Sequence, residues 1–203
     1  MKNAIYALCL LPLLMCASVY AAEKSEAYLL LDSKMDEVIA ILNQPDFKNN
    51  QKNKALMQEV KDKIYSLCDF KEFSARSIGG AWRTFTPEQQ DKLVEAFGEL
   101  IYATYRNKLL DYNGQHFTFK KEIVSAKGDK VEIQTTFPLD NTAAAVNFRM
   151  LKKPEGWKIY DIIIEEVSMI QSYSNQFKEI LKDGTPDKLI GDLQRQAREA
   201  MAK

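Results

Sequence analysis

The change of hydrophobic period at Gly114 constrains the fold of this 203-residue chain more than any other feature. Before Gly114, apolar residues recur every three or four positions, as in amphipathic helices; after it they alternate with polar residues, as in strands. Short turn segments divide the alternating part into four runs, residues 115–125, 130–139, 143–151 and 157–167. Short turns join antiparallel neighbours, because parallel strands need much longer connections. The sequence therefore predicts an α+β fold in which a four-stranded antiparallel meander follows a set of helices.

The helical part is predicted from apolar spacing and from helix start signals. Helices are expected at residues 26–44 and 70–78, with another between them that carries Leu56, Val60, Ile64 and Leu67 on one face. The polar run at residues 46–54 is expected to be a linker. In Thr86-Pro87-Glu88-Gln89, Thr86 can cap a helix and Gln89 can reach back to the cap amide. A long helix should run from there to about Tyr112, and two more helices are expected at residues 168–182 and 186–200.

The first 21 residues have the features of a secretory signal peptide. Lys2 supplies the positive charge, an apolar run follows, and Val19-Tyr20-Ala21 is a cleavage signal. Cleavage would leave a mature domain of residues 22–203, with helical parts at about 22–114 and 168–203 and the sheet at about 115–167. Lipoprotein processing at Cys16 is the alternative, although Met15 stands where a small residue is usual. The sequence predicts a secreted or periplasmic protein.

Composition argues against several classes of function. Without Lys2 the chain has 27 basic residues against 28 acidic ones, a formal charge of −1, whereas a nucleic-acid-binding protein would show a basic excess. Cleavage leaves Cys68 as the lone cysteine, so an internal disulfide is impossible and a small core residue is expected. His116 is the single histidine, and neither metal-ligand spacing nor a glycine-rich phosphate loop is present. We therefore predict neither a metal nor a cofactor.

The last predicted strand is apolar on both of its faces. Ile159 and Ile163 would point one way, and Tyr160, Ile162 and Ile164 the other. Either helices pack on both faces, or a ligand buries one of them, since a hydrophobic pattern reports only burial.

Asp161 would share the face of Ile159 and Ile163, where an unpaired carboxylate is costly. It is either a general base in a closed pocket or a carboxylate that a neighbour such as Arg83 or Trp82 hydrogen-bonds.

Residues 78–114 and 156–177 resemble the MlaC family of periplasmic phospholipid-binding proteins, also called the toluene-tolerance auxiliary family of ABC transporters. The family pattern places Gly and Trp before T-x-x-Q, then spaced Phe, Leu and Tyr, and later W-x-x-Y-D, a Val-Ser pair and a Gln-Phe pair. The matching residues are Gly80, Trp82, Arg83, Thr86, Gln89, Phe97, Leu100, Tyr105, Tyr112, Trp157, Tyr160, Asp161, Val167, Ser168, Gln176 and Phe177. Two positions depart from it, because Glu166 stands where Gly is usual and Ser174 where Arg is common.

The resemblance implies a curled, NTF2-like sheet that encloses an apolar cavity with the helices. It also implies a phospholipid carrier, with the lipid as cargo, that moves between an outer-membrane MlaA-type lipoprotein complex and an inner-membrane ABC transporter complex with an MCE-type subunit. Such transport maintains outer-membrane lipid asymmetry. A hopanoid or sterol-like lipid carrier and an NTF2-like enzyme that uses Asp161 are the alternatives, and nothing in the sequence demands more than a monomer. The residues expected to line the cavity are Phe97, Ile101, Tyr105, Leu109, Phe119, Ile133, Val146, Phe148, Ile159, Ile163, Val167 and Met169.

Overall fold

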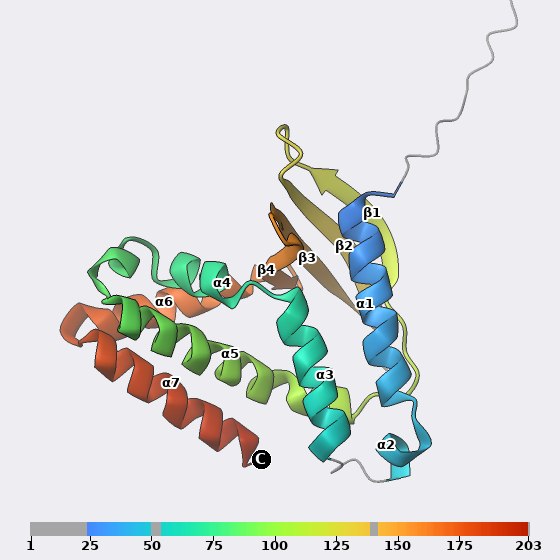
Figure 1. Cartoon of the computed structure of the whole chain (residues 1–203), viewed down its shortest axis with the longest axis horizontal. Helices are drawn as coiled ribbons and strands as arrows, with labels where there is room; N and C mark the ends of the chain where they lie inside the picture. Colours follow the sequence, from blue (N-terminus) through green and yellow to red (C-terminus); the bar gives the residue numbers. More distant parts are fainter. Residues whose placement is uncertain (1–23, 50–53, 139–141, 203) are drawn as a thin grey trace, which may run out of the picture.

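A computed structural model describes residues 24–49, 54–138 and 142–202 of the chain. The predicted signal peptide, residues 1–21, lies outside the described residues, as does Asp140-Asn141, where a turn is expected between the runs 130–139 and 143–151. Helices fill the part before Gly114, strands follow, and two helices come last (Figure 1). The predicted α+β order is confirmed.

The helices before the sheet begin and end close to the predicted positions. They are α1 (Glu26–Leu42), α2 (Pro45–Asn49), α3 (Lys54–Leu67), α4 (Phe70–Ile78), the 3₁₀ helix η1 (Gly79–Thr84) and α5 (Pro87–Leu110). The Ser25 hydroxyl caps α1 by accepting the Tyr28 amide at 3.1 Å. Part of the predicted linker was wrong, because α2 forms there: α1 ends at Leu42, and Pro45 begins the new helix, where proline is well tolerated in the first turn.

The predicted capping box of α5 is present. The Thr86 hydroxyl accepts the Gln89 amide at 3.2 Å, and the Gln89 side chain accepts the Thr86 amide at 3.1 Å. The helix ends at Leu110, where the Asp111 amide still donates to the Asn107 carbonyl. With α4, α6 (Met169–Asp183) and α7 (Pro186–Met201), it forms one helical layer (Figure 1).

The sheet is an antiparallel meander, as predicted. Its strands follow chain order: β1 (Thr118–Val124), β2 (Lys130–Pro138), β3 (Ala143–Lys153), β4 (Gly156–Ile164) and β5 (Val167–Ser168). The prediction of four strands was wrong, because Glu165 and Glu166 adopt φ of 48° and 66° and reverse the chain. Val167 and Ser168 then pair with the end of β4.

The sheet is not strongly curled (Figure 1), in contrast to the prediction. Its pairings shift register at one point between β1 and β2 and at one point between β3 and β4. A bulge bends one strand locally, whereas closing a sheet on itself needs bends at several positions.

The register shift in β4 changes which side chains share a face. Arg149 opposes Asp161, but its neighbour Met150 opposes Ile159, so Tyr160 is an extra residue. Opposed residues lie on one face and successive residues on opposite faces. The expectation that Asp161 shares a face with both Ile159 and Ile163 was therefore wrong for Ile159, because the bulge leaves Asp161 with Ile163 and puts Ile159 on the face of Ile162.

Three hydrophobic cores hold the molecule together. The helical core is built around α4–α7, the sheet core lies between α1 and the strands, and a third core, the α3–α5 core, joins α1, α2, α3 and α5. Ile162 of β4 packs against both the helical core and the sheet core. Within this strand Ile159 and Ile163 are buried by protein, whereas Tyr160, Ile162 and Ile164 are only half-buried.

Candidate functional site

The structure distributes the twelve predicted cavity residues over the cores. Three belong to the helical core or pack against it, namely Phe97, Ile101 and Met169. Five do so in the sheet core, namely Phe119, Ile133, Val146, Phe148 and Ile159. Leu109 packs against the α3–α5 core, and Tyr105, Ile163 and Val167 lie outside all three clusters. The fold thus gathers most of these residues into two groups, one in the helical core and one in the sheet core. Ile162 packs against both cores.

Phe97 is the centre of the helical group. Its ring is fully buried and makes edge-to-face contacts with Phe73, Tyr173 and Phe177 at centroid separations of 5.6, 4.7 and 5.0 Å. These are favourable aromatic geometries. Sequence reasoning did not place Phe73 or Tyr173 near the site, although the spacing of Tyr173 and Phe177 on one helix face could have indicated it.

Several residues of the proposed site are apolar yet not fully buried. Ile101, Leu109 and Val146 are half-buried, while Tyr105 and Val167 are 37% and 57% exposed. Burial also raises the pKa of the Tyr105 phenol, so that ring lies against apolar surroundings. Partly exposed apolar side chains next to packed cores are the surface that an apolar ligand would cover.

Asp161 is buried and fully engaged in hydrogen bonds. Its Oδ2 accepts the Ser168 hydroxyl at 2.7 Å and the Arg149 guanidinium Nη1 at 3.3 Å, and its Oδ1 accepts the Ile170 amide at 3.2 Å. The expectation of a hydrogen-bonded carboxylate is met, but the named partners, Arg83 and Trp82, were wrong. The bulge in β4 turns Asp161 toward the start of α6, where other donors lie.

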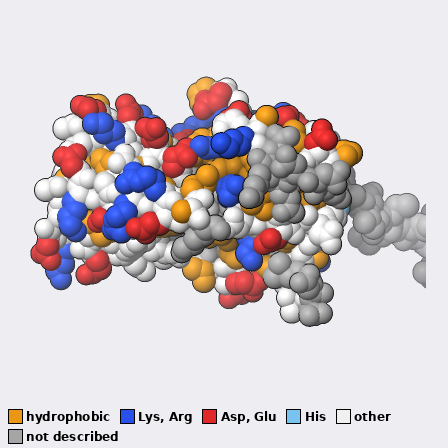
Figure 2. Space-filling view, turned by 90° about the horizontal axis from the view of Figure 1, so that it is seen from below, with side chains coloured by type: hydrophobic (Ala, Val, Ile, Leu, Met, Phe, Trp, Pro, Cys, Tyr) orange, Lys and Arg blue, Asp and Glu red, His pale blue; other side chains and the backbone are white. Residues whose placement is uncertain are grey.

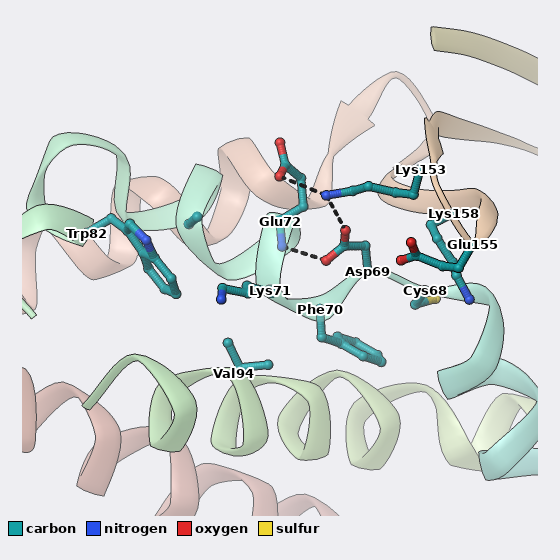
Figure 3. A pocket seen from close by; sticks show the side chains of 11 residues that line it. Cys68, Asp69, Phe70, Lys71, Glu72, Trp82, Val94, Lys153, Glu155 and Lys158 are labelled. Carbon is teal, nitrogen blue, oxygen red and sulfur yellow. Dashed lines mark hydrogen bonds and ion pairs between the residues drawn. The ribbon is translucent and has the colours of Figure 1, made fainter. Parts of the chain in front are cut away.

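A pocket of about 630 Å³ lies between α4, η1, α5 and the β3–β4 turn (Figure 3). None of the twelve predicted residues lines it. Its walls come from segments far apart in the sequence, Cys68, Asp69, Phe70, Lys71, Glu72, Ala75, Trp82, Val94, Lys153, Glu155 and Lys158. Sequence reasoning missed this pocket because no local motif links the α3–α4 junction to the β3–β4 turn.

Ion pairing dominates one wall of this pocket. The Lys153 ammonium lies 2.9 Å from Asp69 and 3.7 Å from Glu72 (Figure 3). Burial alone would raise the pKa of Asp69, but the Glu72 amide and Lys153 outweigh it and lower that pKa. Burial also raises the pKa of the Cys68 thiol to about 12, so it stays protonated at neutral pH. The pocket therefore offers a binding surface without a thiolate nucleophile.

The surface carries charges of both signs. Figure 2 shows Lys and Arg side chains interspersed with Asp and Glu over the helical layer, and apolar side chains gathered where that layer meets the rest of the molecule. Within residues 24–49, 54–138 and 142–202, no three His, Cys, Asp or Glu side chains are placed to hold a metal ion. In the same part of the chain no helix is long and apolar enough to cross a membrane.

Comparisons with known proteins agree on one family. The intermembrane phospholipid transport system binding protein MlaC of Haemophilus influenzae is 23% identical over 181 residues, which are 87% of this chain and 85% of that protein. A phospholipid-binding protein from Ralstonia solanacearum, solved in complex with a phospholipid, superposes with a TM-score of 0.78 at 29% identity. That match covers 88% of this chain and 100% of the other. The family profile described as MlaC protein matches residues 32–195, so the chain belongs to the MlaC family.

Proposed function

We propose that this protein is a phospholipid carrier: it binds a phospholipid and transports it between membranes. The observation that carries the proposal is the shared fold with a relative solved in complex with a phospholipid, over that relative's whole chain. Family membership over residues 32–195 supports it independently. The protein is a transport binding protein and has no catalytic role.

The acyl chains would lie between the helical core and the sheet core. Ile162, which packs against both, marks the place where the two predicted groups meet. On the helical side the lining would be Phe97, Ile101, Tyr105, Leu109, Val167 and Met169. On the sheet side it would be Phe119, Ile133, Val146, Phe148, Ile159 and Ile163. Because half of these side chains are already buried by protein, binding would require the two groups to separate around the lipid.

The energetics of lipid transport favour such a carrier. Exposing one methylene to water costs about 0.8 kcal/mol. Two acyl chains with about thirty methylenes between them would therefore cost roughly 24 kcal/mol to expose. A phospholipid therefore does not cross water unaided at a useful rate. An apolar site in the protein makes transfer from a bilayer nearly isoenergetic, and small affinity differences at each partner then set the direction.

The setting and partners follow from the same proposal. The predicted signal peptide at residues 1–21 would place the mature protein in the periplasm. There it would dock on an inner-membrane ABC transporter complex with an MCE-type subunit and on an outer-membrane MlaA-type lipoprotein complex. The balanced charge of the mature chain supports partners of this kind over nucleic acid.

Native mass spectrometry of the mature protein, purified from the periplasm without detergent, tests this function. We expect a discrete added mass that organic extraction and lipid identification resolve into phospholipid species. A hopanoid or sterol in the extract, in place of phospholipid, would show that the protein carries another class of lipid. A lipid-free mass, under conditions that keep a reference lipid carrier loaded, would contradict the carrier function.

A further inference from the structure

The buried carboxylate of Asp161 requires an explanation beyond stability. Its side chain is 2% exposed, within a strand of apolar neighbours. Replacing a buried ion pair by apolar residues of similar size is often neutral or stabilising, so such a pair is a poor device for stability alone. Buried polar groups are better at selecting one arrangement among several, because only one arrangement satisfies all of their hydrogen bonds.

The donors to Asp161 come from three different elements. Arg149 belongs to β3, Ser168 ends β5, and Ile170 lies in the first turn of α6. The Ser168 hydroxyl also accepts the Gln171 amide at 3.2 Å, which makes it the N-cap of α6. A serine cap by itself starts a helix. The added bonds that the Ser168 hydroxyl and the Ile170 amide donate to Asp161 fix where α6 starts relative to β4.

The backbone that Asp161 holds in place includes residues whose side chains are proposed to line the lipid site. Val167 directly precedes Ser168, and Met169 lies between Ser168 and Ile170. Met169 is buried in the helical core with Phe97, and Tyr173, one turn later in α6, stacks edge-to-face on the same ring. A displacement of the α6 N-terminus would therefore move the part of the proposed lipid site that β5 and α6 form.

We propose that Asp161 is a positioning residue for phospholipid binding, which sets the wall formed by Val167, Met169 and Tyr173 through its bonds to Ser168 and Ile170. Arg149 supports this role, because it joins the carboxylates of Asp161 and Glu132, the latter at 2.9 Å. The inference rests on the proposed function, and it assigns to the Asp of the Tyr-Asp sequence motif a role that is neither acid–base nor ligand contact.

The test compares variants of the mature protein loaded with one fluorescent phospholipid. The variants are Asp161→Asn, Ser168→Ala and Ser168→Thr, and Ser172→Ala is the matched control, since that exposed serine also bonds within α6, to the Ser168 carbonyl. Release into acceptor vesicles is measured below the unfolding temperature of each. We expect release on the order of tenfold faster for Asp161→Asn and Ser168→Ala, the factor that one lost hydrogen bond to a charged group represents. Ser168→Thr, which keeps the hydroxyl, and Ser172→Ala should match the wild type.

Each outcome decides a different question. Variants that unfold at lower temperature but release lipid at the wild-type rate would show that Asp161 only stabilises the fold, which overturns the inference. If Asp161→Asn does not fold, Ser168→Ala and Arg149→Gln carry the same comparison. Wild-type protein that cannot be loaded at all contradicts the proposed function itself, whereas loaded wild type with equal release from every variant contradicts only the role of Asp161.

Discussion

Glu166 occupies a backbone conformation that suits glycine. Its φ of 66° lies in the left-handed region, which costs a non-glycine residue roughly 1–2 kcal/mol. The MlaC pattern usually has Gly at this position, and the turn forms in this chain nonetheless. Glu165 holds it to β3, because its carboxylate accepts the Ala145 amide at 2.6 Å and its own amide donates to the Ala145 carbonyl.

Replacing Glu166 by glycine should therefore stabilise the protein. We expect Glu166→Gly to raise the free energy of unfolding by about 0.5–1 kcal/mol, since glycine removes the strain but adds entropy to the unfolded chain. Urea unfolding of the mature protein measures the change. Glu166→Ala is the control, because it removes the same carboxylate and keeps the strain. Equal stability of the two variants would show that the left-handed backbone is not the cause.

A substitution of Val167 can distinguish a side chain that contacts lipid from one that only packs against protein. It is 57% exposed, so Val167→Asp should change the free energy of unfolding by no more than about 0.5 kcal/mol. If the side chain lines the lipid site, the new carboxylate would be buried against acyl chains, and phospholipid occupancy in native mass spectrometry should fall. Val124→Asp on β1 is the matched control, since Val124 is 53% exposed. Equal occupancy of both variants would remove Val167 from the lining.

At the scale of elements, ion pairs join α4 to the end of the sheet. Lys153, the last residue of β3, contacts Asp69 at the N-cap of α4 and Glu72 in its first turn. The Asp69 amide also donates to the Ile159 carbonyl of β4 at 2.8 Å. The side chain of Arg76 lies over the Tyr160 ring, 4.6 Å from its centre. These contacts attach the helical layer along the otherwise free edge of β4.

The Lys153 contacts predict a specific dependence of stability on pH. The pKa of Asp69 is lowered from 3.8, so its ion pair stabilises the folded state above that value and is lost as the pH falls through the lowered pKa. We expect Lys153→Met to cost about 1 kcal/mol of unfolding free energy at neutral pH. The difference from wild type should shrink in acid, where Asp69 is protonated.

Urea unfolding at several pH values measures that difference. Lys152→Met is the control, because Lys152 pairs with Glu26 at an exposed site and should contribute little at any pH. A Lys153→Met deficit that stays constant through the acid range would mean that the lysine acts by packing rather than by its charge.

Periodicity and start signals predicted most elements, but not the features that position the site. The capping box of α5 and the order of the strands follow from local sequence. The Glu165–Glu166 turn contains no glycine, which is the usual sequence signal of such a turn. The prediction therefore missed the chain reversal and β5. The bulge at Tyr160 leaves no mark in the pattern Ile159 to Ile163, yet it decides that Asp161 faces Ser168. Tertiary hydrogen bonds fix both features, and a single sequence does not reveal them.

For the whole molecule, apolar residues could be predicted as buried but not as ligand contacts. Phe97 and Phe148 are equally expected in a solid core and in a lipid site, because hydrophobic patterns report loss of water and not what replaces it. The structure places them in two separate cores. What distinguishes a carrier is therefore the energy with which these cores admit acyl chains, and that energy has a measurable signature.

The signature is the dependence of binding on acyl-chain length and salt. If the acyl chains supply the binding energy, a short-chain phospholipid and its homologue with four more methylenes in all should differ by up to about 3 kcal/mol, at about 0.8 kcal/mol per methylene. Raising the salt concentration should change either affinity little, because apolar burial is not screened. Competition against a fluorescent phospholipid, with both competitors below their micelle concentrations, measures the two affinities. Equal affinities that fall as salt rises would mean that the headgroup binds to surface charges, and the acyl chains would then lie outside the two cores.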